Sequence, residues 1–293
     1  MAGGLKEVRE RIGSVQNTMQ ITSAMKMVSA AKLRRAQDAI TRMRPYAEKI
    51  QSILANVSAT LDSSEGVFSE DRNVKTALVV CITSDRGLCG AFNNYSIKIA
   101  KTAVEAYEAN GVKALVLPLG KKAIEAFPSS EGRMPNGFEP VQIFADLNFN
   151  DSSEVADFIM NGFVSGDWDS VELAYSKFKN AAVQIPTNEK FLPLLPEEGE
   201  EAESSNQTEY IFEPNREEIV QNILPSALKT QLYKALLDSH AAEHGARMTA
   251  MHSATENAGE LLNELKISYN KARQAAITTE ILEIVAGSEA LEG

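Results

Sequence analysis

The feature that most constrains the fold is a repeat of apolar residues in the N-terminal part of the chain. Steps of three and four residues alternate along it, which is the heptad pattern of a coiled coil. In one register, the positions are Leu5, Val8, Ile12, Val15, Met19, Leu33, Ala36, Ile40, Met43, Ala47, Ile50, Leu54, Val57 and Leu61. The intervening positions of that register are polar: Thr22, Lys26 and Ser29. The pattern predicts one coiled-coil helix over residues 1–62.

A second repeat of the same kind lies near the C-terminal end. Its positions are Met251, Ala254, Ala258, Leu261, Leu265, Ser268, Ala272, Ala275, Thr279 and Leu282. Small side chains dominate, so a partner helix can approach closely. We expect a second coiled-coil helix over 216–293, antiparallel to 1–62. Two helices packed separately on a globular core are the alternative.

The end of this second helix departs from the repeat. Seven of the eleven residues from Ala276 to Ala286 are apolar, and they point all round the helix. A helix that is apolar all round must be buried. A thin rod of two helices has little with which to bury it, so a partner should form a collar around this tip. Its large apolar residues are Ile277, Ile281, Leu282, Ile284 and Val285.

Between the two helices the sequence predicts an α/β domain over 74–195. Two apolar runs with β-branched residues, 76–83 and 113–120, flank an expected helix at 93–111, which makes a βαβ unit with parallel strands. The remaining elements are a third strand at 141–147, a helix at 151–166, and a hairpin of strands at 170–178 and 181–194. The predicted fold is therefore α/β plus a long antiparallel two-helix coiled coil, with a mixed, Rossmann-like sheet of about five strands inserted between the helices.

Charge is distributed unevenly. The first 49 residues hold ten Lys or Arg and four acids, which gives +6 there and leaves −17 for the rest of a chain whose net charge is −11. The basic end favours an acidic partner, either nucleic acid or a protein surface rich in carboxylates. Residues 196–215 are strongly acidic, and we expect a solvated loop. A metal site in that loop is disfavoured because nothing fixes the ligand geometry.

The stretch SDRGLCGAFN at 84–93 raises the possibility of an enzyme, because it stands between a strand and a helix. It has neither of the common glycine-rich phosphate-binding patterns. A catalytic Cys89 would need a histidine, and the three histidines, His240, His244 and His252, are distant in sequence and expected on the surface. The glycines are explained more simply by a tight turn. No catalytic, cofactor-binding or metal-binding residues are predicted.

Three stretches carry a family resemblance: RIGSVQNTMQITSAMKMVSAAKLRRAQ at 11–37, SDRGLCGAFN at 84–93, and residues 246–291. Together they resemble the gamma subunit of the F-type ATP synthase, over nearly the whole chain. The start at MAGG without a transit peptide, and the missing cysteine-bearing insertion of the chloroplast form, suggest a bacterial form. The segment 128–140 carries little family signature.

The resemblance implies a non-catalytic rotor shaft that couples ion flow through the membrane c ring to ATP synthesis at the beta subunits. The expected partners are one hexameric collar of alpha and beta subunits, the epsilon subunit and the c ring, with one copy of the chain per complex. No nucleic acid, direct nucleotide binding or cofactor is expected. The expected location is the cytoplasmic face of the bacterial inner membrane, as a peripheral subunit.

The resemblance also assigns roles to particular residues. Contacts with beta subunits are implied for Met25, Lys26, Lys32, Arg34, Arg35, Arg247, Arg273, Gln274 and Thr278. A segment facing the c ring is implied at Tyr210, Ile211, Phe212 and Glu213. Two alternatives remain. A cytosolic α/β enzyme with coiled-coil arms would bind a ligand at 84–93. A nucleic-acid-binding coiled coil is opposed by the net charge and by the lack of aromatics before Tyr46.

Overall fold

The structure is a computed structural model that describes residues 2–58, 68, 72–129, 132–138, 143–194 and 216–292. The chain divides into two compact units. The coiled-coil unit comprises Met1–Ala30 and Arg247–Gly293, and the α/β unit comprises Ala31–Ala246. The elements are α1 (Ala2–Ser58), β1 (Thr76–Ile82), α2 (Phe92–Ala109), β2 (Lys113–Leu119), α3 (Lys121–Ala126), α4 (Phe149–Ser165), β3 (Ser170–Phe178), β4 (Gln184–Leu192) and α5 (Arg216–Glu292).

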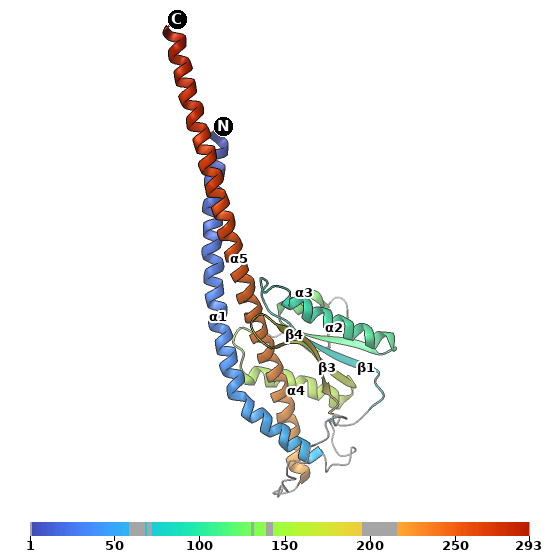
Figure 1. Cartoon of the computed structure of the whole chain (residues 1–293). Helices are drawn as coiled ribbons and strands as arrows, with labels where there is room; N and C mark the ends of the chain where they lie inside the picture. Colours follow the sequence, from blue (N-terminus) through green and yellow to red (C-terminus); the bar gives the residue numbers. More distant parts are fainter. Residues whose placement is uncertain are drawn as a thin grey trace. The chain divides into compact units, whose positions relative to one another are not determined.

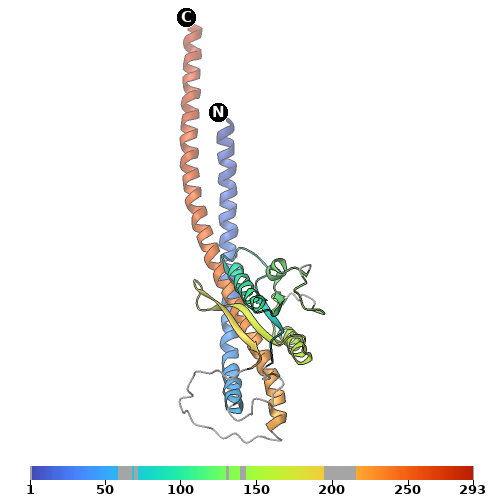
Figure 2. The ribbon, with the colours of Figure 1, turned by 90° about the vertical axis from the view of Figure 1, so that its right-hand side faces the viewer.

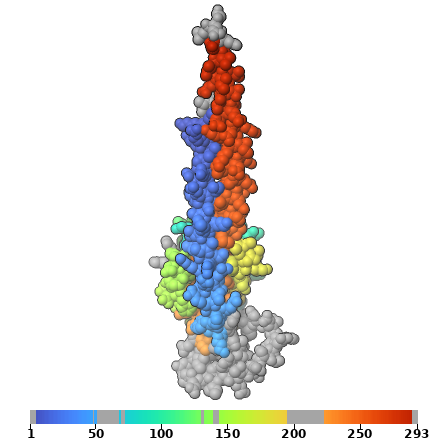
Figure 3. Space-filling view, turned by 60° about the vertical axis from the view of Figure 1, so that its left-hand side comes forward, coloured from blue at the N-terminus to red at the C-terminus, as the bar shows by residue number. Residues whose placement is uncertain are grey.

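In the coiled-coil unit, α1 and α5 lie side by side and antiparallel (Figures 1 and 2). Three contacts fix the direction, because the α5 number falls as the α1 number rises. Arg9 Nη2 donates to Tyr269 Oη at 2.7 Å, Thr255 Oγ1 lies 2.8 Å from Thr22 Oγ1, and Lys26 Nζ lies 3.2 Å from His252 Nδ1. The predicted antiparallel pairing is therefore confirmed. The space-filling view shows α5 continuing past the N-terminus of α1 (Figure 3).

The α1 repeat predicted from the sequence is confirmed where exposure is described. From Leu5 to Ile50, positions in that register are buried or half-buried, whereas the residues between them are mostly exposed. The polar positions Thr22 and Ser29 are buried as well. Their hydroxyls are satisfied within α1, by the carbonyls of Met19 and Met25 respectively. The large residues Met27 and Val28 point to solvent.

The register predicted for the α5 repeat is partly wrong. Six of its ten positions are buried or half-buried, as predicted: Met251, Ala254, Ala258, Leu265, Ala272 and Thr279. The alternating positions between them are Leu262, Tyr269 and Ala276, whereas the predicted Leu261, Ser268 and Ala275 are exposed. The steps of three and four simply occur in the opposite order. Because small residues occur on both sides of α5, the sequence does not determine the order of these steps. In the observed order, Tyr269 faces α1 and contacts Arg9.

The α/β unit is built on a four-stranded mixed sheet with the order β2-β1-β3-β4. Strands β2, β1 and β3 are parallel, and β4 pairs antiparallel with β3. The helix α2 connects β1 to β2, as the βαβ reading predicted. The predicted fold class is confirmed: a mixed α/β sheet between two long terminal helices.

Alternate residues of the buried strands enter two cores, one on each face of the sheet (Figure 1). On one face, Val79 and Cys81 of β1 pack with Ala100 and Val104 of α2. On the other face, Leu78, Val80 and Ile82 pack with residues of α4 and α5, including Ile159, Phe163, Leu228, Leu232 and Leu236. Because both faces of the sheet are covered, β1 and β2 are nearly continuous apolar runs rather than alternating ones.

The predicted third strand at 141–147 is wrong where the structure describes it. Residues 143–146 form turns and bends and residue 147 is irregular, although Ile143 and Phe144 are buried in the core that α4 and α5 cover. The apolar run indicated burial, and burial alone does not require a sheet partner. The sheet therefore has four strands among the described residues instead of five. The short helix α3 was not predicted, and α4 begins two residues before the predicted 151, because the side chain of Asn148 accepts the backbone N–H of Asp151.

Candidate partner-contact surfaces

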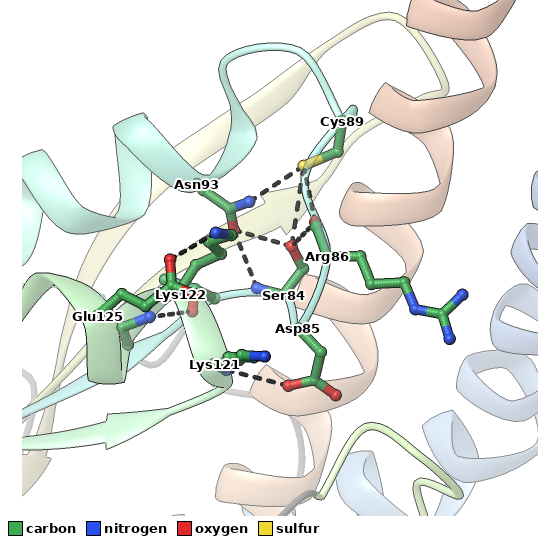
Figure 4. A network of polar contacts seen from close by, with 10 residues as sticks. Ser84, Asp85, Arg86, Cys89, Asn93, Lys121, Lys122 and Glu125 are labelled. Atoms are coloured by element: carbon green, nitrogen blue, oxygen red, sulfur yellow. Dashed lines mark hydrogen bonds and ion pairs between the residues drawn. The ribbon is translucent and has the colours of Figure 1, made fainter.

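The stretch 84–93 folds into a turn closed by its own side chains (Figure 4). Asn93 Oδ1 accepts the backbone N–H of Ser84 at 3.0 Å, and Ser84 Oγ lies 2.7 Å from the carbonyl oxygen of Arg86. Asn93 Nδ2 donates to Cys89 Sγ at 3.2 Å. Leu88 and Gly90 turn the chain with φ of 63° and 60°. Polar groups that could meet a ligand are thus used to close the turn.

The same turn ties the ends of β1 and β2 together. Thr83 Oγ1 accepts the backbone N–H of Ala123 at 2.8 Å, and Asp85 Oδ1 accepts that of Lys121 at 3.0 Å (Figure 4). Gly120 has φ of 100°, and a Cβ there would lie 2.4 Å from the Thr83 carbonyl oxygen. These contacts hold the residues that follow β1 against the start of α3, which directly follows β2.

Besides its polar contacts within the turn, Cys89 packs against apolar side chains. It is buried together with Phe92 of α2 and with Ala242 and Ala246 of α5, and Phe178 packs against the group. Both cysteines of the chain are free thiols, and burial raises the pKa of Cys81 to about 12. Among the described residues, no three His, Cys, Asp or Glu side chains gather in a way that could hold a metal ion. The loop has the geometry of a structural turn.

Met25 and Lys26 belong to the coiled-coil unit. Both are half-buried. Lys26 reaches across to α5, where its Nζ lies 3.2 Å from His252 Nδ1, and His252 Nε2 lies 3.6 Å from Glu256. Lys26 therefore has a polar partner inside the chain. The thioether of Met25, in contrast, can accept only a weak hydrogen bond.

Three basic candidates, Lys32, Arg34 and Arg35, lie on α1 in the α/β unit. All three are exposed, while Leu33 and Ala36 beside them are buried. The helix thus presents its cations to solvent and its apolar side to the unit's interior, which suits an acidic partner surface.

The candidates on α5 in the coiled-coil unit fall into two groups. Arg273, Gln274 and Thr278 are exposed, and Thr278 Oγ1 donates to the backbone carbonyl of Gln274 at 2.9 Å. Arg247 differs, since only 7% of it is exposed. A buried arginine acts on a partner more readily through the helix than by direct contact.

The apolar tip of α5 is uncovered within the chain. The exposed fractions are 45% for Ile277, 54% for Ile281, 63% for Leu282, 71% for Ile284 and 50% for Val285. Large aliphatic side chains gathered at this exposure mark an interaction surface. The predicted c-ring segment, Tyr210 to Glu213, and the acidic loop 196–215 lie outside the described residues.

The expectation that the histidines lie on the surface is wrong for two of them. His244 is buried and His240 is half-buried, and they contact each other within the α/β unit. Only His252 is exposed. The spacing of four residues was visible in the sequence, but the burial of that side of α5 was not.

A partly buried polar cluster between β3, β4 and α5 was also not predicted from the sequence. Glu189 Oε2 accepts from Tyr175 Oη at 2.7 Å, and Glu189 Oε1 accepts from Gln231 Nε2 at 2.8 Å. Asp238 is buried nearby on α5, and its burial raises the pKa of its carboxyl. The positive charges of Lys234, Lys177 and Arg44 oppose this rise, whereas Glu189 adds to it.

Asp238→Asn should raise the stability of the chain at about pH 7. A folded-state pKa above the ordinary 3.8 means that the folded chain holds the proton more tightly than the unfolded chain. Proton binding by Asp238 therefore stabilises the folded chain at low pH, and this stabilisation is lost as the pH rises through the raised pKa of the carboxyl. Asparagine removes the buried charge, so denaturant unfolding should show a gain at about pH 7 that shrinks towards pH 4. A loss of stability at neutral pH would mean that the three cations outweigh burial.

Comparisons of the sequence with known proteins agree with the fold described above. A family model described as ATP synthase matches residues 4–291. The ATP synthase gamma chain of Flavobacterium johnsoniae is 55% identical over 290 residues, with 99% of both chains covered. That of Cytophaga hutchinsonii is 50% identical over 294 residues, with 98% of both covered.

Solved structures share the fold. A chain of the Euglena gracilis mitochondrial ATP synthase, from the structure of OSCP, F1 and the c-ring in rotational state 3, matches with a TM-score of 0.69 and 21% identity, over 99% of this chain and 95% of that one. A chain of the Tetrahymena thermophila mitochondrial ATP synthase, from its central stalk and c-ring, matches with a TM-score of 0.55 and 24% identity, over 80% and 99%.

The chain combines a mixed α/β sheet with two long terminal helices, and ATP synthase gamma chains match it over nearly its whole length. These features define a subunit of an ATP synthase. The chain belongs to the gamma chain family of the ATP synthases. A gamma chain is a subunit of the complex and is not itself the catalytic enzyme. None of the helices among the described residues is both long and apolar enough to cross a membrane.

Proposed function

We propose that the chain is the central rotor shaft of a bacterial ATP synthase, present once per complex. The c ring would turn it from the membrane, and the coiled-coil unit would turn inside a collar of alternating alpha and beta subunits. An asymmetric shaft contacts each beta subunit differently, and a ligand or partner can shift a conformational equilibrium only through such differential contacts. The complex would lie at the cytoplasmic face of the inner membrane, with the epsilon subunit beside the α/β unit.

The uncovered apolar tip of α5 is the observation that carries this proposal. From Ile277 to Val285 the large aliphatic side chains are 45–71% exposed on a helix that continues beyond its own partner helix. Full burial of such a side chain contributes about 1.5–3 kcal/mol. In the free chain these exposed side chains contribute little burial free energy. An apolar sleeve formed by other subunits would bury them on every side of the helix, without requiring specific hydrogen bonds.

Seven candidate residues on α1 and α5, of which six are exposed and Met25 is half-buried, would supply contacts that differ with orientation. We infer that Met25, Lys32, Arg34, Arg35, Arg273, Gln274 and Thr278 meet the beta subunits. The internal contact of Lys26 with His252, and the burial of Arg247, favour supporting roles for these two residues. The segment from Tyr210 to Glu213 is proposed to face the c ring on the family resemblance alone.

By the family resemblance, Met25 passes an acidic segment of a beta subunit, and Met25→Lys tests this proposed contact. The substitution places a second cation beside Lys26, and a partly desolvated ion pair with that segment contributes about 1–3 kcal/mol, much less if it is exposed. A bond made in only some rotor positions deepens those positions. The number of ions pumped per ATP hydrolysed in membrane vesicles should therefore fall, while hydrolysis itself persists.

Met25→Leu is the matched control, because it keeps the size and apolarity of the side chain and should be nearly neutral. Both variants need to be compared in fully assembled complexes. An unchanged pumping ratio for Met25→Lys would remove Met25 from the contact surface.

A further inference from the structure

Two imidazoles of α5 face each other inside the α/β unit. His240 and His244 lie one helical turn apart, and their Nε2 atoms are 3.1 Å from each other. The two rings are nearly perpendicular, at 86°, with centroids 4.5 Å apart. The ring of Phe144 stacks on His240 at a centroid distance of 6.2 Å. The pair is thus held in place by its helix and by an aromatic wall.

The spacing of the two nitrogens matches that of ligands on one metal ion. A tetrahedral ion with Zn–N distances of about 2.0–2.1 Å holds two nitrogens roughly 3.3 Å apart. Two histidines four residues apart on a helix lie on the same face, one above the other. In the metal-free chain this separation is that of a hydrogen bond between the two imidazoles. It lies within a few tenths of an ångström of the separation that two imidazole ligands on one ion require, so an ion would replace this hydrogen bond.

We propose that His240 and His244 together bind one divalent ion of the late transition series, such as Zn²⁺ or Ni²⁺, through their Nε2 atoms. Imidazole is a preferred ligand of these metals. Because the described residues hold no third His, Cys, Asp or Glu in a common group, water completes the coordination sphere. Water can reach the ion from the side of His240, which is half-buried, whereas His244 is 4% exposed.

The bound ion would clip two successive turns of α5 to each other beside Phe144. Metal binding needs the ligand nitrogens unprotonated, so acid weakens it. With only two protein ligands, the site is open to added chelators and its affinity is modest. This property is independent of the rotor function and would hold for the isolated chain.

The test is a calorimetric titration of the purified full chain, without an affinity tag and after treatment with a chelator, with Zn²⁺ and with Ni²⁺ separately. One ion per chain is expected, together with a higher thermal unfolding midpoint in the presence of the metal. His240→Gln should weaken binding at least about tenfold, in line with the effect of disturbing a metal site. His240→Cys should retain binding, because a thiolate is also a zinc ligand.

His252→Gln is the matched control, because it removes the exposed histidine of the other unit and should leave the titration unchanged. Circular dichroism of each variant checks that α5 remains folded. The proposal is overturned if the parent chain shows no saturable binding, if His240→Gln binds like the parent, or if binding disappears with His252→Gln instead.

Discussion

Removing residues 277–293 should lower ATP synthesis by the assembled complex several-fold while leaving the α/β unit folded. The deleted stretch carries Ile277, Ile281, Leu282, Ile284 and Val285, all of which are exposed in the chain. It makes no contribution to the sheet or to either core of the α/β unit. The truncation should therefore weaken the binding of the tip in the proposed collar of alpha and beta subunits. Each buried aliphatic side chain contributes about 1.5–3 kcal/mol to this binding, before the entropic cost of association is subtracted.

Two full-length variants separate the loss of apolar surface from the loss of length. One replaces Ile277, Ile281, Ile284 and Val285 with serine, and the other replaces the same four residues with leucine. The serine variant should resemble the truncation in reconstituted vesicles, and the leucine variant should resemble the parent. Normal synthesis by the serine variant, or loss of the sheet's circular-dichroism signal in the isolated truncated chain, would contradict the assignment.

Gly162→Ala should destabilise the α/β unit by about 1–3 kcal/mol, as overpacking a filled core does. Gly162 lies in α4, and a Cβ there would be 2.0 Å from Cζ2 of Trp168. The indole is buried, and its Nε1 donates to the carbonyl of Ile159 at 3.0 Å. The methyl group would displace the ring and break this bond. Because Trp168 is the single tryptophan of the sequence, its fluorescence during denaturant unfolding reports the change directly.

Gly13→Ala is the control for this experiment. Gly13 also lies inside a helix, but a Cβ there would meet nothing within 4 Å. The same substitution should then be neutral or stabilising by roughly 0.5–1 kcal/mol, from helix propensity alone. Equal effects at the two glycines would show that the indole is not packed against α4 as described.

The sequence predicted the architecture wherever side chains were large and patterned. In α1, residues such as Leu5, Ile12 and Leu33 left one possible register, and that register was found. In α5 the repeat is made largely of alanine and other small residues, so two orders of the same steps were equally acceptable. The difference between Leu261 and Leu262 depends on the partner helix, which local sequence does not encode.

Tertiary contacts explain the other errors. Ile143 and Phe144 have the apolar character of a strand, but they fill a core without joining the sheet. Asp238 is buried where β3, β4 and α5 meet, and His244 is buried beside His240. Nothing near either residue in the sequence signals this burial. The proposed contacts with other subunits depend on the surfaces of those subunits as well as on this chain.

Direct observation of rotation tests the central claim. Lys101→Cys places a single thiol on the exposed side of α2, since Cys81 and Cys89 are buried, and a bead attached there would report on the α/β unit. With the alpha and beta subunits fixed to a surface, addition of ATP should drive the bead in one direction only. Full ATP hydrolysis with a stationary bead would contradict the account.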